Sequence, residues 1–333
     1  DDGGWGWWYD DKTDVYQTAW VVFGLAVTRE AGYAVETRVI ERGANYLLDE
    51  IKSNELMDPR IQAYALYSLA RAGYGNRELT LALVEQVYAL DAFSQAGLAL
   101  ALQKLGEKDQ AKTVLDILNE TLRTNGTASF WAADRVDGKY HNMTMSSSIR
   151  STALGLTAFL QIEPDSENIP QLVSYLMKQR KAYGWGTTNE TAFTLLALTD
   201  FVRQTQQNEN AINYQVLIND QPITSGMVTR GEPAVAILLP LDEMQTGPNL
   251  FKIVTSGEGM LYFDLISRIS QDLPSIDPAG TIEVSRTYTD PKTKEPVTHL
   301  QVGQLVRVSV RIKGPANAIY YVLVEDHLPA GLE

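Results

Sequence analysis

The first residues whose types and spacing could do chemistry are three aspartates near the start of the chain, in the run Asp10-Asp11-Lys12-Thr13-Asp14. This run fits the DDxxD pattern with which some isoprenoid synthases hold magnesium and a diphosphate, because clustered carboxylates suit hard cations. The plainer interpretation is that Asp14 caps a helix beginning at Val15, with Gln17 completing a capping box. A synthase would also need a second acidic cluster on a later apolar helix, and the sequence has none. We therefore expect a helix cap.

The other chemically useful side chains do not form a catalytic or metal-binding set. His141, His299 and His327 are too scattered for a helical metal-ligand spacing, and there is no cysteine to act as a nucleophile or zinc ligand. Asp91 and Asp200 stand at the ends of apolar segments, where capping or solvent exposure accounts for them. We assign no catalytic, cofactor-binding or metal-binding residue, and we expect no cofactor.

Composition narrows the class of protein. The chain has 333 residues, 44% of them hydrophobic, and a net charge of −13. Such a chain can bury a large core, but its acidity argues against a nucleic-acid partner. It has no apolar run of the ~18 residues that a membrane span needs and no secretion signal at its start, so we interpret it as a mature or excised segment.

Helical segments of two kinds alternate in the first half of the chain. In one kind the apolar residues form a single stripe, as expected for helices with one wet face; these are residues 40–51, 79–90, 111–122 and 169–176. In the other kind apolar or small residues run nearly all round, so both sides should be covered; these are residues 15–27, 61–72, 92–105, 149–160 and 191–202.

This alternation predicts two concentric layers of helices, as in an α/α toroid, although a solenoid would alternate in the same way. The covered helices should form the inner ring, so that Leu115 and Leu172 point inward from outer helices while Gln110 and Gln171 are wetter. The covered helices also share a loose internal repeat of a small or polar residue followed by alanine, as in Thr18-Ala19. We expect residues 130–148, which lack a helical period, to form a long loop or short hairpin.

After about residue 208 the apolar period changes to two, which is typical of strands with one buried face. The expected strands carry Tyr214, Val216 and Ile218; Phe251 and Ile253; Leu261, Phe263 and Leu265; and Val306, Val308, Val310 and Ile312. A fully apolar strand at 319–324 should pair with the strand at 305–313. Too few residues remain for a complete sandwich.

Three stretches of this sequence resemble the bacterial alpha-2-macroglobulin family. They are Gly3-Gly4-Trp5-Gly6-Trp7-Trp8 followed by Asp14 to Val22 and Ala31-Gly32-Tyr33; Gly257 to Phe263; and Val324 to Glu333. The resemblance implies an α/α toroid followed by β-sandwich domains: a thioester-type toroid at 1–207, truncated at its N-terminus, part of a CUB-type domain at 208–272, and a macroglobulin-like domain at 273–333, truncated at its C-terminus.

The same resemblance implies a function. The chain would belong to a broad-spectrum inhibitor that traps proteases after bait cleavage, in the periplasm or outside the cell, with a membrane anchor ahead of Asp1 as one route of attachment. Its partners would be proteases and the remaining macroglobulin-like domains. The family's reactive bond joins a cysteine to a glutamine in a Cys-x-Glu-Gln motif, and this sequence has no cysteine, so the chain would be scaffold rather than enzyme.

Two other classes of function remain open at this point. A helical toroid with opposed carboxylates in its bowl would indicate an enzyme such as a polysaccharide lyase, a glycosidase or a terpene cyclase-like protein. Exposed tryptophans in the loops at Trp5 and Trp185 would instead favour a carbohydrate-binding surface protein, although packing is the commoner role of such residues.

Overall fold

The computed structural model describes most of the chain, in two compact units, Asp1–Leu261 and Tyr262–Glu333. Each unit is described by itself. The described residues are 2–8, 10–134, 145–181, 184–205, 211–229, 234–239, 244–257, 261–263, 265–267, 280–315, 322–329 and 331–332.

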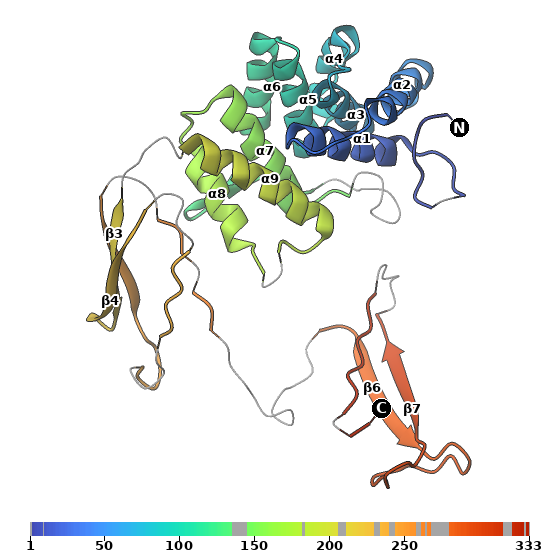
Figure 1. The fold of residues 1–333 in the computed structure, drawn as a ribbon, viewed down its shortest axis with the longest axis vertical. Helices are drawn as coiled ribbons and strands as arrows, with labels where there is room; N and C mark the ends of the chain where they lie inside the picture. The colour runs from blue at the N-terminus through green and yellow to red at the C-terminus, as the bar shows by residue number, and fades with distance from the viewer. Residues whose placement is uncertain are drawn as a thin grey trace. The chain divides into compact units, whose positions relative to one another are not determined.

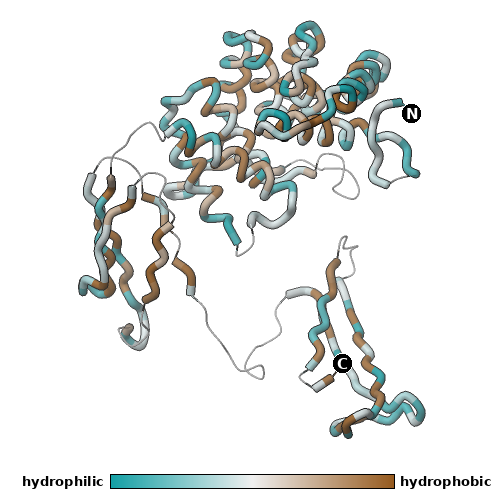
Figure 2. Tube along the Cα trace, in the orientation of Figure 1, coloured by the Kyte–Doolittle hydropathy of each residue, from teal (hydrophilic) through white to brown (hydrophobic). Residues whose placement is uncertain are grey.

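The helices of the first unit form two layers (Figure 1). The inner helices pack in sequence order and are α1 (Val15–Glu30), α3 (Pro59–Ala72), α5 (Ala92–Lys104), α7 (Ser148–Ile162) and α9 (Thr188–Thr205). The outer helices are α2 (Thr37–Ser53), α4 (Arg77–Val84), α6 (Lys108–Glu120) and α8 (Asn168–Lys178), with a short 3-10 turn at Val87–Ala89. Helices α2, α4 and α6 each pack against two consecutive inner helices, and α8 packs against α7. The predicted order of inner and outer helices is confirmed. Hydrophobic residues concentrate where the helices face one another (Figure 2).

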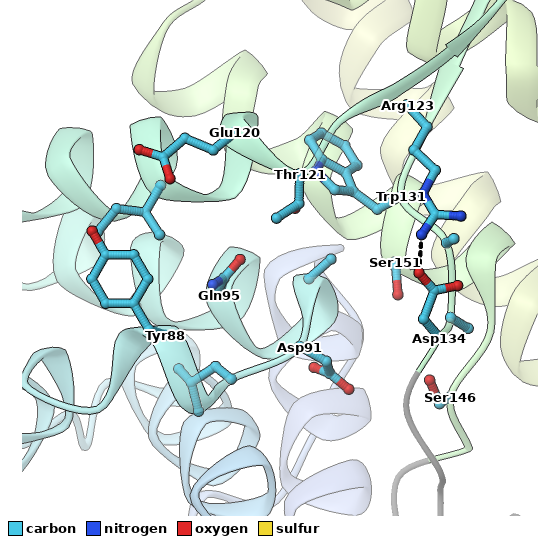
Figure 3. Close-up of a pocket in the computed structure, with 15 residues that line it drawn as sticks. Tyr88, Asp91, Gln95, Glu120, Thr121, Arg123, Trp131, Asp134, Ser146 and Ser151 are labelled. Atoms are coloured by element: carbon cyan, nitrogen blue, oxygen red, sulfur yellow. Dashed lines mark hydrogen bonds and ion pairs between the residues drawn. The ribbon is translucent and has the colours of Figure 1, made fainter.

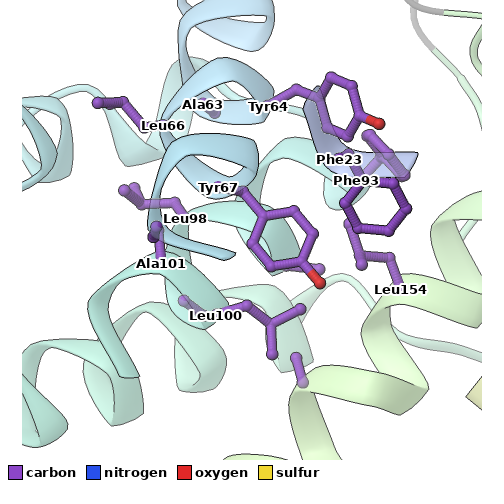
Figure 4. Close-up of a cluster of buried hydrophobic side chains, with 14 of the residues drawn as sticks. Phe23, Ala63, Tyr64, Leu66, Tyr67, Phe93, Leu98, Leu100, Ala101 and Leu154 are labelled. Atoms are coloured by element: carbon purple, nitrogen blue, oxygen red, sulfur yellow. The ribbon is translucent and has the colours of Figure 1, made fainter. Parts of the chain in front are cut away.

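Aromatic rings fill the axis on which the inner helices converge (Figure 4). The ring of Phe193 in α9 lies 5.4 Å from Trp20 and 5.5 Å from Phe23, both in α1. It also lies 5.2 Å from Phe93 in α5. A side chain of the last inner helix, Phe193, thus contacts side chains of the first inner helix. The series of helices therefore curves back on itself, as in a toroid, and is not a linear superhelix.

Burial follows the predicted layers with one exception. Leu115 and Leu172 are fully buried, and Gln110 is exposed. Gln171 is half-buried because its Oε1 accepts a 2.7 Å hydrogen bond from Ser129 Oγ. Helices α3, α5 and α7 are covered on both sides, as expected.

The exception concerns the two ends of the inner series. The prediction that both end helices are fully covered is wrong. In α9, Leu195 is 52% exposed and Val202 43%. In α1, Gly24 is exposed within the predicted segment 15–27. The physical reason is that α1 packs closely along only one inner helix, α3, and α9 along only one, α7.

A hydrogen bond between a tryptophan and a threonine recurs at the start of three inner helices. The backbone N–H groups of Trp5, Trp131 and Trp185 donate to the hydroxyl oxygens of Thr18, Thr152 and Thr191, at 2.9, 3.2 and 3.0 Å. Each threonine is followed by the alanine of the sequence repeat. The repeat therefore marks the position at which the preceding loop is attached to an inner helix.

Asp14 caps α1 as expected, because its side chain accepts a 2.8 Å hydrogen bond from Gln17 N. The reciprocal half of the predicted capping box is absent here. The backbone N–H of Asp14 donates instead to Trp5 O at 2.9 Å, and Gln17 Nε2 is buried without a partner. The loop before the helix has taken the place that the glutamine side chain would occupy.

A short hairpin precedes the stretch that was expected to hold a loop or hairpin. It pairs β1 (Arg123–Asn125) with β2 (Ala128–Phe130) around Gly126, whose φ is +61°. The paired strands thus lie just ahead of the predicted stretch. Residues 131–134 and 145–147 belong to no helix or strand, which agrees with the loop alternative, and residues 135–144 lie outside the described residues. The dipeptide Asn125-Gly126 is a strong hairpin signal that could have located the turn.

The first unit also contains a three-stranded antiparallel sheet in the order β4-β3-β5. Its strands are β3 (Ile212–Ile218), β4 (Gln221–Val228) and β5 (Phe251–Ser256), so the two predicted strands at 214–218 and 251–253 are confirmed and β4 was missed. The expected strand at Leu261 to Leu265 is wrong, because the described residues of that stretch join no ladder.

Among the described residues of the second unit, β6 (Glu283–Thr289) pairs with β7 (Arg307–Lys313) in antiparallel orientation. The predicted strand at 306–312 is confirmed, but its partner is β6, and Val322 to Val324 join no ladder; residues 316–321 lie outside the described residues. The apolar side of β7 is not buried as predicted: Val310 and Ile312 are exposed. The two strands that the structure describes in this unit provide no second layer to cover that side.

Two helical glycines allow a direct test of the toroid packing. A Cβ at Gly155 in α7 would lie 2.4 Å from the buried Trp131 ring, whereas one at Gly24 in α1 would meet nothing within 4 Å. We expect Gly155→Ala to lower the free energy of unfolding by about 1–3 kcal/mol through overpacking. Gly24→Ala should raise it by about 0.5–1 kcal/mol through helix propensity. Urea unfolding followed by circular dichroism measures both, and equal effects would contradict the proposed packing.

Candidate functional site

The C-terminal ends of the inner helices surround a cavity of about 480 Å³. Every inner helix contributes to the cavity from its last turns. The five inner helices are therefore parallel, with their C-terminal ends on the same side of the ring. The lining residues are Glu30 from α1; Tyr67 and Arg71 from α3; Leu100 and Lys104 from α5; Leu160 and Gln161 from α7; and Asp200, Arg203 and Gln204 from α9. This cavity is the bowl in which an enzyme of this architecture would hold its catalytic groups.

Basic side chains predominate in the bowl. Arg71, Lys104 and Arg203 lie in the last turns of their helices, where the partial negative charge of the carbonyl ends favours cations. Arg71 also binds Glu30 through Nη2 at 2.7 Å and Nε at 3.0 Å, and Lys104 lies 3.7 Å from the same carboxylate. Glu30 is therefore held in an ion-pair network.

Asp200 is the second carboxylate of the bowl. The sequence interpretation of Asp200 as a cap or a solvent-exposed group is wrong, because it lies within α9 and is half-buried in the cavity wall. Burial raises its pKa above the usual 3.8, although the charges of Arg71 and Arg203 oppose that rise. A raised pKa is what a general acid requires, so the bowl contains one feature of an acid–base site.

A glycosidase or lyase needs two carboxylates with complementary roles, one of them free to act as base or nucleophile. Here Glu30 is neutralised by Arg71 and Lys104, which leaves Asp200 without a free acidic partner in the described part of the bowl. The arrangement is that of a charged helix-end network with one partly desolvated acid.

A smaller pocket of about 250 Å³ lies between the ends of α5, α6 and α7 (Figure 3). It contains the carboxylates of Asp91, Glu120 and Asp134. Asp91 caps α5 by accepting from Ser94 N at 2.9 Å, as predicted, and Asp134 is ion-paired with Arg123. Trp131 forms the inner wall, with its indole N–H donating to Leu118 O at 2.8 Å. Two of its three acids are thus occupied.

The remaining sequence candidates are not brought together. Asp10 and Asp11 are exposed in the loop before α1. His299 and His327, in the second unit, are also exposed, and His141 lies outside the described residues. The described residues contain no group of three or more possible metal ligands. None of the helices that the structure describes is long and apolar enough to cross a membrane.

The tryptophans of the loops divide into two groups. Trp185 is buried, with its indole N–H donating to Leu176 O at 2.5 Å, and Trp5 is half-buried against Gly43, so packing is confirmed for these two. Trp7 and Trp8, for which no packing role was predicted, are 43% and 80% exposed. The backbone of their loop is held by Trp5 O, which accepts from Asp14 N at 2.9 Å, and by Trp8 O, which accepts from Asp11 N at 3.1 Å.

Sequence reasoning missed the charged residue at the centre of the ring. Arg150, the third residue of α7, is 0% exposed. Its Nη1 donates to Tyr16 Oη at 2.7 Å, and its guanidinium carbon lies 3.9 Å from the centre of the Phe93 ring. The available signal was a positive charge in the first turn of an apolar helix, where the helix dipole disfavours it.

Comparison with known families matches two parts of the chain. The family described as "A-macroglobulin TED domain" matches residues 77–201, and the family described as "Bacterial Alpha-2-macroglobulin MG10 domain" matches residues 282–333. These are the helical part from α4 to α9 and the segment that contains β6 and β7.

Individual relatives extend the likeness. Alpha-2-macroglobulin of Escherichia coli K12 is 26% identical over 100% of this chain, which spans 19% of that protein's length. The crystal structure of Salmonella alpha-2-macroglobulin reacted with methylamine matches 94% of this chain, and 20% of its own, with a TM-score of 0.58 and 20% identity. Escherichia coli alpha-2-macroglobulin activated by porcine elastase matches 94%, and 27% of its own chain, with a TM-score of 0.51 and 18% identity. This chain is thus about a fifth as long as the sequence relative.

The raised pKa of Asp200 predicts how stability depends on pH. An acid whose pKa is higher in the folded state than in the unfolded state costs stability when it is ionised, and this cost disappears as the pH falls through both values. We therefore expect Asp200→Asn to raise the melting temperature at pH 7, with the difference vanishing below pH 3.8. Calorimetry across this pH range measures the effect.

Glu30→Gln is the matched control for this experiment, because it removes a carboxylate that is ion-paired with Arg71 in the same bowl. It should lower the melting temperature at pH 7. If Asp200→Asn behaved like Glu30→Gln, Asp200 would be a stabilising partner of the arginines and our account of its environment would fail.

Proposed function

Because this chain belongs to the bacterial alpha-2-macroglobulin family, we propose that it is a segment of a broad-spectrum inhibitor that traps proteases after they cleave a bait segment. The observation that carries the proposal is the order of its parts. A helical toroid matched by the TED family precedes a β segment matched by the MG10 family, and the likeness to the Escherichia coli protein runs through the whole chain.

Within such a protein, we assign these residues a scaffold role. The sequence contains no cysteine, so no thioester can form between its own side chains. The inner ring is filled by Trp20, Phe23, Phe93 and Phe193, which gives the toroid a rigid wall. A wall of this kind can exclude water and nucleophiles from a reactive group placed against it.

The partners follow from the same proposal. A solved relative is described as activated by porcine elastase, which supports proteases as the targets of the longer protein. The other partners would be further macroglobulin-like domains of the same protein. We place it in the periplasm or outside the cell, because an inhibitor of foreign proteases must meet them there.

We also propose that the segment is not an enzyme. The support is the ion pairing of Glu30 in the bowl, which leaves Asp200 without a free acidic partner among the described residues. A hydrolase or lyase acting in this bowl would lose its activity in Asp200→Asn and in Glu30→Gln alike.

Trapping predicts a size-dependent loss of protease activity. When the longer protein is mixed with elastase, we expect hydrolysis of a large protein substrate to fall while hydrolysis of a short peptide substrate persists, because enclosure excludes by size. Native electrophoresis should show a mobility change at the same time. Elastase inactivated at its nucleophile is the control and should cause neither effect. Progressive digestion of the longer protein with no protection of the large substrate would contradict the proposal.

The absence of cysteine predicts the response of the 333-residue chain to amines. Methylamine should add no mass to it, because the sequence offers no thioester for the amine to open. Intact-mass spectrometry after incubation measures this. A stable adduct would mean that another electrophile forms within these residues, and the scaffold assignment would then be wrong.

A further inference from the structure

Arg150 is a buried cation without a counter-charge among the described residues. Its side chain is 0% exposed, and no carboxylate in the part of the chain that the structure describes forms an ion pair with it. Nη1 donates to Tyr16 Oη at 2.7 Å and approaches Asn189 Oδ1 at 3.4 Å. Nε and Nη2 are buried and have no hydrogen-bond partner in the structure.

This arrangement is costly as it stands. An arginine is almost never fully buried unless it is paired, and its guanidinium cannot escape the cost by losing a proton. The face of Phe93, 3.9 Å away, and the Tyr16 hydroxyl compensate part of the charge. The position in the first turn of α7 works in the opposite direction, since the helix end is itself positive.

A second buried donor stands beside this cation. The hydroxyl of Tyr64 in α3 is buried and has no partner in the structure. The ring of Tyr64 packs 5.2 Å from that of Tyr16 and 5.6 Å from that of Phe93, the two rings that hold Arg150. Burial raises the pKa of Tyr64 well above its usual range, so the hydroxyl keeps its proton at neutral pH and can donate it.

We propose that Arg150 and Tyr64 together bind a small inorganic anion, of the size of chloride, at the axis of the toroid. The anion would accept hydrogen bonds from Nε or Nη2 of Arg150 and from the Tyr64 hydroxyl, and its charge would offset the guanidinium. The site must be small, because none of the three cavities of 250–480 Å³ is lined by Arg150. A water molecule could satisfy the donors but would leave the charge uncompensated.

The proposal predicts that chloride stabilises the full-length protein, with a melting temperature that rises with the logarithm of the chloride concentration. A ligand that binds only the folded state raises the melting temperature with each tenfold increase above its dissociation constant, here by roughly 3–5 °C. The melting temperature should be measured in sodium chloride and in sodium gluconate at equal ionic strength, since gluconate is too large for the site. Crystals soaked in bromide should show an anomalous peak within hydrogen-bond distance of the Arg150 guanidinium.

Variants separate this site from general salt effects. Arg150→Met keeps the volume of the side chain without its charge and should abolish the difference between chloride and gluconate. Tyr64→Phe should weaken the chloride dependence without abolishing it. Arg71→Met, at the opposite end of the same ring, is the matched control and should leave the chloride dependence intact.

Equal melting temperatures in chloride and gluconate would overturn the proposal, and water or a carboxylate from elsewhere in the protein would then be the partner of Arg150. A chloride dependence that survives in Arg150→Met would overturn it as well, because the anion would then bind elsewhere.

Discussion

The convergence of five parallel helices on one axis is the constraint on which the helical part depends. Side chains must fill that axis, and here aromatic rings do so: Phe193 alone touches Trp20, Phe23 and Phe93, which come from two other helices. Alanines in the repeat keep the helix backbones close enough for these rings to meet, and a methyl group added at Gly155 would already collide with Trp131. Aromatic packing therefore fills the ring, and a small number of side-chain hydrogen bonds, such as that from Arg150 in α7 to Tyr16 in α1, also link its helices.

Parallel orientation also gives the two ends of the ring opposite electrostatic character. The carbonyl ends favour cations, and the bowl collects Arg71, Lys104 and Arg203 there, with Glu30 and Asp200 as their acidic neighbours. The amide ends favour anions, and most of their caps follow that rule, as Asp14 and Asp91 do. Arg150 breaks it. Burial and the helix dipole both disfavour the charge of Arg150, so another group must compensate it. The charges of the bowl already have partners and indicate no such missing group.

Much of this architecture could be predicted from the sequence because periodicity reports burial directly. The layers followed from apolar stripes, and Leu115 and Leu172 lie where the stripes placed them. The failures share a different cause, since each depended on a partner that is distant in the chain. The sequence pattern predicts that Leu195 is buried, but α9 has no second inner helix packed closely along it. Ile312 follows the alternation of a buried strand residue, but no second layer of the described structure covers it. Arg150 could not be identified as the central charge, because its partners Tyr16 and Phe93 come from two other helices.

The filled axis also bears on function. An enzyme built on a helical ring keeps an open bowl in which free acidic side chains face the substrate. Here aromatic side chains occupy the axis, and the bowl that remains ties Glu30 to Arg71. A ring of this kind is suited to present a stiff surface at either end, with exposed apolar residues such as Leu195 and Trp8 at its edges. Such a surface acts by covering another part of the protein and excluding water from it. A wall that shields a reactive group in a protease-trapping protein requires this property.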